Sequence, residues 1–328
     1  METERPKPHS VYINPYTDFG FKKLFGEDCS KDLLIDFLNQ LLPSKYQIVD
    51  LEFRNSEIPA EIATYRKAIY DIHCENERKD KFVVEMQKTR LEYFKDRVIW
   101  YMTFPIRDQA KKGTVLKIVK GEEKKVDWDF KLSPVYFVGI LDFEYDQSYP
   151  NKEQNYIMEV EYKDQDNVIF YDKLKYFFIV MPRFTKTEGQ LVTRKDKWLY
   201  FLKNLESFEH IPEILNEPIF RKAFDLAELA HYNAEQLHHY EQSYNEYLSF
   251  NSSLKYKFKE GKEEGLKEGK EEGLKEGLEK GIEKGKEEGI LEGKYETARN
   301  AIQAGLSNEM IKTITHLTDE QIDRLRQE

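Results

Sequence analysis

Two acidic residues, Asp71 and Glu85, are the side chains in this sequence whose types and spacing best fit a reaction centre. The runs Ile69–Glu75 and Lys81–Gln87 are rich in strand-forming residues, and the polar segment Asn76–Asp80 between them predicts a hairpin loop. If the strands pair symmetrically about this loop, the two carboxylates oppose each other with Cβ atoms roughly 5 Å apart. Like charges at that separation repel unless a cation lies between them, so the pair predicts a divalent-metal site.

Side-chain alternation divides the hairpin into two faces. Asp71, His73, Val83, Glu85 and Gln87 share one face, which is polar and acidic. A solvated face of an ordinary hairpin also carries carboxylates, so the pattern alone leaves a metal site and a solvated surface both open. A single histidine there is more often structural than a ligand. We expect the opposite face to belong to the core; it comprises Tyr70, Ile72, Cys74, Phe82, Val84 and Met86.

The hairpin is one of several blocks that occur in a characteristic order. The blocks are Asn14–Gly26, Leu33–Leu42, Tyr70–His73, Val84–Gln87 and Tyr93–Arg97 followed by Tyr101. Together they resemble the PD-(D/E)XK nuclease superfamily, in particular the transposase-like branch that contains the recombination-promoting nucleases. The resemblance implies a restriction-endonuclease-like α/β (α+β) fold, in which helices flank a mixed sheet. It also implies a metal-dependent endonuclease that hydrolyses phosphodiester bonds in DNA.

The resemblance assigns roles to the hairpin residues. It implies that Asp71 and Glu85 are catalytic and bind Mg²⁺, and that Gln87 occupies the position where the wider superfamily has a lysine. An amide cannot supply the positive charge of a lysine. Glutamine here is nevertheless typical of the transposase-like branch, and we expect Gln87 to position the attacking water by hydrogen bonding.

Basic residues follow the hairpin directly. Lys88, Arg90, Lys95 and Arg97 are close enough in sequence to orient a phosphate, and we take Lys88 and Arg97 as the phosphate-binding candidates. The alternative is that these basic residues are ordinary surface charges of a helix. Asp18 lies in another of the matching blocks; it is either an additional acid of the site or a first-turn acid that favours a helix N-terminus.

Composition limits the class of protein. The chain has 328 residues, of which 34% are charged and 14% are aromatic, and this is not the aromatic-poor profile of disorder. A formal net charge of -10 argues against a general polyanion binder, although DNA binding needs only a local basic track. The two cysteines, Cys29 and Cys74, have no metal-site spacing, and we expect both to be reduced thiols in or near the core.

No part of the sequence predicts a membrane anchor. The first residues, 1–8, contain no apolar signal-peptide region, and no apolar run approaches the roughly 18 residues that span a bilayer. We therefore expect no membrane partner and a cytoplasmic location.

Around the hairpin, the pattern predicts elements in the order α-α-β-β-β-α. Thr17 is a candidate N-cap for a helix over 18–25, and Ser30 for a second helix that reaches Leu42. The next predicted elements are a strand over 46–53, the hairpin, a helix over 92–110, strands over 134–143, 156–162 and 176–181, and helices over 194–206 and 218–230. The lysine-rich segment 111–131 is either a hairpin insertion that touches phosphates or a solvated loop.

A Lys/Glu/Gly repeat follows the predicted nuclease domain, which we place at 1–253 with a helical extension. The repeat, 254–294, has a glycine at every fourth position from Gly261 to Gly293. Each glycine costs a helix about 1 kcal/mol relative to alanine. The repeat is therefore either a charged linker that is partly frayed or a long helix that associates with another copy. Homo-oligomerisation as a coiled coil through this repeat is our prediction.

The last segment, 295–328, predicts a small helical tail. Gly305 can end a helix, Ser307 can cap the next, and Thr318 with Gln321 forms a capping box for the last. The prediction is thus a Mg²⁺-dependent DNA endonuclease. The alternative is a catalytically inactive, nuclease-like scaffold that forms oligomers and binds DNA or protein.

Overall fold

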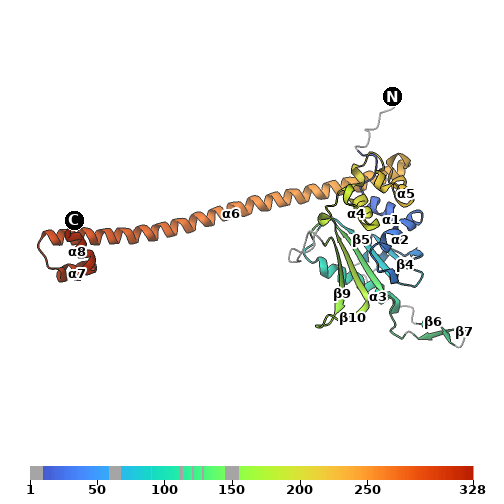
Figure 1. Ribbon diagram of the computed structural model, residues 1–328, viewed down its shortest axis with the longest axis horizontal. Helices are drawn as coiled ribbons and strands as arrows, with labels where there is room; N and C mark the ends of the chain where they lie inside the picture. The colour runs from blue at the N-terminus through green and yellow to red at the C-terminus, as the bar shows by residue number, and fades with distance from the viewer. Residues whose placement is uncertain are drawn as a thin grey trace, which may run out of the picture. The chain divides into compact units, whose positions relative to one another are not determined.

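The computed structural model describes residues 10–58, 68–89, 91–110, 114–119, 122–127, 129–144 and 155–327 (Figure 1). Contacts within the chain divide it into two compact units, Met1–Ser249 and Phe250–Glu328. The first unit holds a mixed sheet with helices on both faces, as the resemblance implied.

Six strands form this sheet, in the order β1-β4-β5-β8-β10-β9. The β5–β8 and β8–β10 pairs are parallel, and the other pairs are antiparallel. The strands are β1 (Leu51–Phe53), β4 (Ile72–Asn76), β5 (Lys81–Gln87), β8 (Val135–Leu141), β9 (Ile157–Lys163) and β10 (Ile169–Val180). Two further pairs lie outside it: β2 (Glu57–Ile58) with β3 (Ala68–Ile69), and β6 (Thr114–Val119) with β7 (Glu122–Asp127).

Two hydrophobic cores lie against the sheet. The larger one joins the sheet to α1 (Asp18–Phe25), α2 (Lys31–Asn39), α4 (Arg194–Asn204) and α5 (Pro218–Ala227), with Trp198 fully buried among aromatic rings. The smaller one joins it to α3 (Phe94–Ala110), and its members come from both: Tyr70, Val83, Phe94, Val98, Tyr101, Met102, Phe137 and Phe178. β5 is a central strand with a hydrophobic core on each face, so the side chains on both of its faces are buried.

This double coverage corrects two expectations about the hairpin. The face that carries Val83 and Glu85 is not solvated, because α3 packs over it and leaves Glu85 only 2% exposed. Tyr70 packs on this α3 side instead of with Ile72 and Cys74, and its hydroxyl donates to the carbonyl oxygen of Tyr101 (2.9 Å). The chain bends at Asp71 before β4 begins, so strand alternation does not extend back to Tyr70.

Several local predictions are confirmed. The α1 helix begins after Thr17, whose hydroxyl accepts a hydrogen bond from the Gly20 N–H, and it ends at Phe25. Glycine at position 20 is needed here, because a Cβ would lie 2.2 Å from the Asn14 carbonyl oxygen. The predicted helix over 92–110 is α3, and the elements predicted between 134 and 230 are present. The strand predicted over 176–181 is longer than expected, because β10 already begins at Ile169; the other ends differ by at most three residues. In the 111–131 segment, β6 and β7 form an antiparallel hairpin; residues 111–113, 120–121 and 128 lie outside the described residues.

Other predictions are wrong. Ser30 precedes α2 without capping it, because its hydroxyl donates to the Glu27 carbonyl oxygen. Cys29 is exposed, whereas Cys74 is buried as expected. The strand predicted over 46–53 is limited to Leu51–Phe53.

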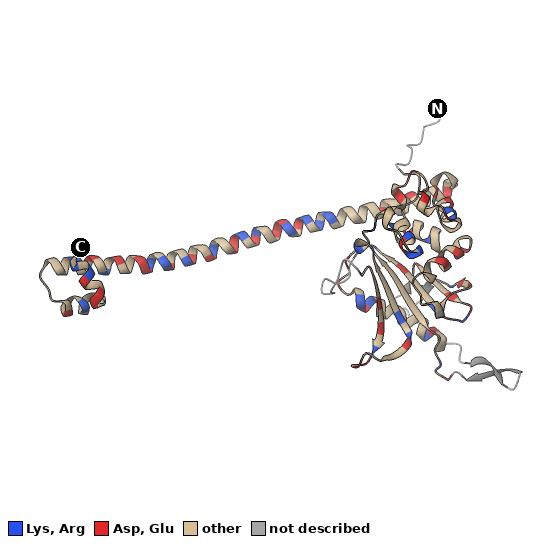
Figure 2. Cartoon of the chain, in the orientation of Figure 1, with Lys and Arg blue, Asp and Glu red and all other residues tan. Residues whose placement is uncertain are grey.

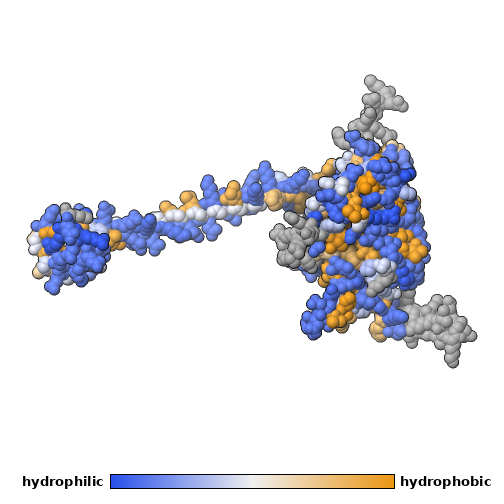
Figure 3. Space-filling model, viewed as in Figure 1, coloured by the Kyte–Doolittle hydropathy of each residue, from blue (hydrophilic) through white to orange (hydrophobic). Residues whose placement is uncertain are grey.

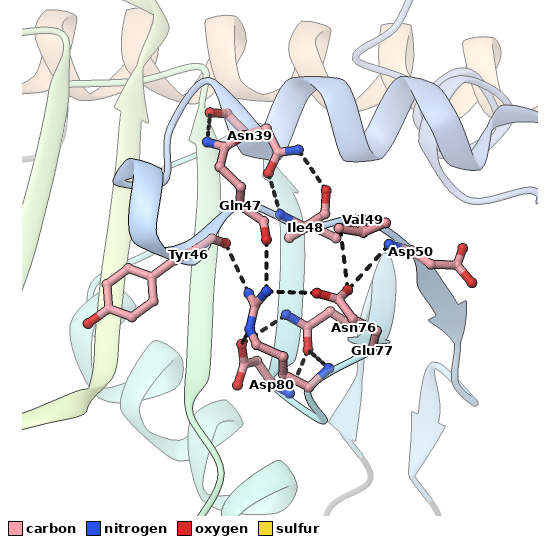
Figure 4. A network of polar contacts seen from close by, with 10 residues as sticks. Asn39, Tyr46, Gln47, Ile48, Val49, Asp50, Asn76, Glu77 and Asp80 are labelled. Carbon is pink, nitrogen blue, oxygen red and sulfur yellow. Dashed lines mark hydrogen bonds and ion pairs between the residues drawn. The ribbon is translucent and has the colours of Figure 1, made fainter.

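In this segment, side chains form hydrogen bonds with backbone groups that a strand would have paired with a neighbouring strand (Figure 4). The Arg78 guanidinium donates to the carbonyl oxygens of Gln47 (2.8 Å) and Tyr46 (3.1 Å), and the Asn39 amide pairs with both backbone groups of Ile48. Arg78 also donates to the Asp80 carboxylate (3.2 Å). These contacts fasten the β4–β5 turn to the segment that follows α2, at the end of the hairpin away from the acidic pair.

The helix α6 (Ala234–Gln303) contains the whole glycine repeat, and α7 (Asn308–Thr315) and α8 (Asp319–Gln327) follow it. Basic and acidic residues alternate along the repeat (Figure 2), and isolated apolar residues lie exposed between them (Figure 3). A small core of Ala298, Ile311, Leu317 and Ile322 joins the three helices. Gly305 ends α6 with a φ of 80°, and Thr318 and Gln321 form the predicted capping box. Within the described ranges, no helix is long and apolar enough to cross a membrane.

Candidate active site

The β4–β5 hairpin brings Asp71 and Glu85 together. The strands pair with Ile72 opposite Val84, so the next pair toward the bend is Asp71 with Glu85, in the predicted register. The Asp71 N–H donates to Glu85 Oε1 (3.3 Å), and the Met86 N–H donates to Asp71 Oδ2 (2.7 Å). A backbone N–H of each strand thus orients the carboxylate on the other strand. The symmetric hairpin pattern predicted that the two carboxylates are close, but not these hydrogen bonds.

Burial and mutual repulsion both disfavour ionisation of this pair. Burial is the main reason that the pKa of Glu85 is raised to about 8, and the neighbouring Asp71 charge raises it further. Burial also raises the pKa of Asp71, against the lowering effect of the Met86 N–H, and Asp18 adds to the increase. The two acids therefore retain a proton at neutral pH, and a cation between them would remove the repulsion.

Gln87 is bonded to this pair. Its Nε2 donates to Glu85 Oε2 (2.7 Å), and this bond favours the ionised form of Glu85. The side chain lies at the end of β5, on the same side of the strand as Glu85, and it is half-buried. The amide therefore orients the acid, and its carbonyl oxygen is chemically able to accept a hydrogen bond from water.

The two phosphate-binding candidates act on different acids. Arg97, in the first turns of α3, lowers the pKa of Glu85, and its guanidinium donates to the Tyr101 hydroxyl (2.8 Å) and lies over that ring (4.9 Å). Lys88, directly after β5, lowers the pKa of Asp71, and its Nζ lies 5.7 Å from the centre of the Tyr247 ring. The structure thus places a cation near each carboxylate. Arg90 lies outside the described residues, and Lys95 is exposed on α3.

Asp18 has features of both roles considered for it. It lies in the first turn of α1 and forms an ion pair with Lys22 (2.9 Å), as a surface helix acid does. Its charge nevertheless raises the pKa of Asp71, so Asp18 is also a neighbour of the acidic pair. Lys22 opposes this effect, and the sequence analysis did not single it out.

The sequence analysis did not single out Asp142, an acid whose backbone adjoins the end of β5. It follows β8 directly, and its N–H donates to the Gln87 carbonyl oxygen (2.9 Å) because β5 and β8 run parallel and end together. Nearby protein atoms raise the pKa of Asp142, but the residue is exposed, so solvent limits this effect. An acidic residue directly after the apolar run 135–141 was the available signal.

His73 is a core residue and does not join the acids. Its Nδ1 lies 3.3 Å from the Asn55 carbonyl oxygen, its ring packs against Tyr70, and burial lowers its pKa. Its Nε2 has no hydrogen-bond partner among the described residues. Across those same residues, no group of three or more His, Cys, Asp or Glu is arranged to hold a metal ion. The donor set at the hairpin is thus two carboxylates. Mg²⁺ accepts such a set because it keeps several waters and is completed by substrate phosphates.

A mixed sheet flanked by helices, with paired acids at the end of a central hairpin, is the architecture of a PD-(D/E)XK nuclease core. The family model described as "PD-(D/E)XK nuclease family transposase" matches residues 15–257, so the chain belongs to this family. No curated protein and no solved structure matches the chain. Membership indicates a nuclease-type function, and PD-(D/E)XK nucleases generally use divalent metals.

The raised pKa of Glu85 makes a prediction about stability. A carboxyl whose pKa is raised by folding leaves the folded state with more protons than the unfolded state, so stability falls as pH rises from about 4.5 to about 8. Glu85→Gln removes this loss. We expect the free energy of unfolding of the variant, relative to that of the wild type, to be higher at pH 8 than at pH 5 by at least about 1 kcal/mol. Urea unfolding in EDTA measures this difference.

The exposed acid Glu52 on β1 provides the matched control. Glu52→Gln should change the free energy of unfolding equally at the two pH values. A stability difference between Glu85→Gln and the wild type that is the same at pH 5 and pH 8 would contradict the raised pKa.

Proposed function

We propose that this protein is a Mg²⁺-dependent DNA endonuclease that hydrolyses phosphodiester bonds. The observation that carries the proposal is the mutually oriented pair of the half-buried Asp71 and the buried Glu85 at the end of the hairpin. Two acids held this close at a desolvated position cost stability, and such a cost is typical of a functional site. Family membership supports phosphodiester cleavage as the reaction, with DNA as the substrate.

Asp71 and Glu85 would hold the Mg²⁺. The raised pKa values of both acids fit this role, because a divalent cation takes the place of the proton that they otherwise retain. When bound, such a cation polarises the scissile phosphate and lowers the pKa of a nearby water.

The remaining residues would orient and balance charge. Gln87 holds Glu85 by its amide N–H and would direct a water toward the phosphorus through its carbonyl oxygen. Arg97 and Lys88 would neutralise the oxygens of the phosphate from two sides, and Asp18 would act as an additional acid beside Asp71. Attack of the water forms a new phosphorus–oxygen bond, the bond to the leaving oxygen breaks, and the leaving oxygen takes up a proton.

A second candidate function is an inactive nuclease-like scaffold that associates through the repeat. A Cβ added to any glycine from Gly261 to Gly293 would meet no atom within 4 Å, so the whole stripe is open. Exposed apolar residues follow five of these glycines: Leu266, Leu274, Leu278, Ile282 and Ile290. A four-residue period advances about 40° per repeat around the helix. In the predicted coiled coil, a second copy would therefore have to follow a glycine stripe that winds around the helix.

Plasmid cleavage tests the enzyme. We expect purified protein to cut supercoiled DNA in Mg²⁺ and not in EDTA, and Asp71→Asn or Glu85→Gln to lower the rate by at least about a hundredfold, because each removes a metal ligand. Glu52→Gln should cut like the wild type. Equal residual cleavage in both site variants and the wild type would indicate a contaminating nuclease and sink the proposal.

Sedimentation velocity tests association through the repeat. We expect the full chain to sediment above its monomer mass of 39.2 kDa, and a chain that ends at residue 253 to sediment as a monomer. A chain that ends at residue 294 keeps the repeat and loses the tail, so it should associate like the full chain. An oligomeric state that does not change when the repeat is removed would count against this interface.

A further inference from the structure

The outer side of α3, which faces away from the sheet, exposes several large apolar side chains. Its inner side packs on the sheet through Phe94, Val98 and Tyr101. On the outer side, Trp100 is 37% exposed and Ile99 is 52% exposed, and Tyr93 just before the helix is 66% exposed. Clustered exposed aromatic and aliphatic side chains mark an interaction surface more often than scattered ones do.

Aromatic and basic residues recur along this side. The spacings of four and three between Tyr93, Arg97, Trp100, Phe104 and Arg107 place them along one face of a helix. Phe104 is only 7% exposed and belongs to the core against the sheet, whereas Tyr93, Trp100 and Arg107 are exposed and Arg97 is half-buried. We name these five residues the α3 stripe. Three of them are in contact: the Trp100 and Phe104 rings meet edge to face at 4.7 Å, and the Arg107 guanidinium lies 5.2 Å from the centre of the Phe104 ring.

One end of the stripe lies near the acidic pair. Arg97 donates to the Tyr101 hydroxyl (2.8 Å), and Tyr101 contacts Tyr70, the residue directly before Asp71, through its ring (5.4 Å) and its carbonyl oxygen (2.9 Å). Because a helix rises about 1.5 Å per residue, Arg107 lies about 15 Å further along α3 than Arg97. A ligand that enters the candidate active site could therefore continue along the stripe.

The chemistry of the stripe fits one kind of ligand. Flat exposed rings stack on nucleobases, and guanidinium groups pair with phosphates and stack on rings themselves. Glu92 and Asp96 lie on the same exposed side, and the whole chain carries a net charge of -10, so charge attraction alone would bind a polyanion weakly. Stacking must then supply much of the affinity. A duplex hides the faces of its bases, whereas an unpaired strand presents them.

We propose that the α3 stripe binds an unpaired nucleic-acid strand next to the acidic pair. The inference rests on the proposed nuclease function and narrows its substrate to DNA with single-stranded or locally unpaired segments. Trp100 and Tyr93 would stack on bases, and Arg97 would hold the phosphate nearest to the carboxylates.

Fluorescence anisotropy of labelled oligothymidylate in EDTA tests the stripe without cleavage. We expect the wild-type protein to bind this single strand more tightly than the oligothymidylate–oligoadenylate duplex. Trp100→Ala and Tyr93→Ala should each weaken single-strand binding at least about fivefold, because each removes one stacking surface. Trp100→Phe keeps a ring and the contact with Phe104, so it should bind nearly as well as the wild type. Phe170→Ala, which removes an 81% exposed ring from β10, is the matched control and should bind like the wild type.

The outcomes separate this inference from the proposed function. Unchanged binding in Trp100→Ala and Tyr93→Ala, an equal loss in Phe170→Ala, or duplex binding as tight as single-strand binding would overturn the stripe even if plasmid is cut in Mg²⁺. Single-strand binding that depends on Trp100 would support the stripe, and absence of Mg²⁺-dependent cleavage of the same oligonucleotide would then overturn the nuclease proposal alone.

Discussion

The arrangement of this protein depends on keeping two carboxylates close together, one of them half-buried and the other almost fully removed from solvent. Asp71 and Glu85 repel each other, and burial makes the repulsion stronger. The hairpin resists it with a backbone N–H donated to each carboxylate and with the Gln87 amide on Glu85. At the other end of the hairpin, the Arg78 contacts fix the turn. The helix α3 packs on the face of β5 that carries Glu85. The fold therefore stores an unfavourable pair that a cation would relieve.

Much of this could be predicted because the signals are local. The loop at 76–80 is symmetric, so the register that opposes Asp71 and Glu85 follows from the sequence, and the Thr17 cap and the 3.6-residue apolar spacing define α1 and α3. The remaining features arise from contacts between distant segments. Arg78 donates to the carbonyl oxygens of Tyr46 and Gln47, which the expected strand would have used for pairing. The helix α3 buries the hairpin face that carries Glu85, which side-chain alternation alone predicts to be polar. Asp142 reaches Gln87 only because β8 lies parallel to β5.

Family membership and the geometry address different levels of function. The family model covers both the hairpin and the helices that enclose it, which establishes the nuclease class. In the proposed mechanism, the chemistry depends on the few side chains around Glu85. Gln87 stands where the wider superfamily has a lysine, and Arg97 and Lys88 would supply the positive charge instead. The family model ends at residue 257, so membership in the family carries no information about the glycine stripe of α6.

Direct binding of a divalent cation is the most direct test of the central claim that the acidic pair is a metal site. Isothermal titration of Mn²⁺, used as a substitute for Mg²⁺, into the full-length protein at pH 8 should give about one site per chain. That site should be lost in both Asp71→Asn and Glu85→Gln and kept in Glu52→Gln. Binding of equal affinity and stoichiometry in the wild type and in both site variants would contradict the account.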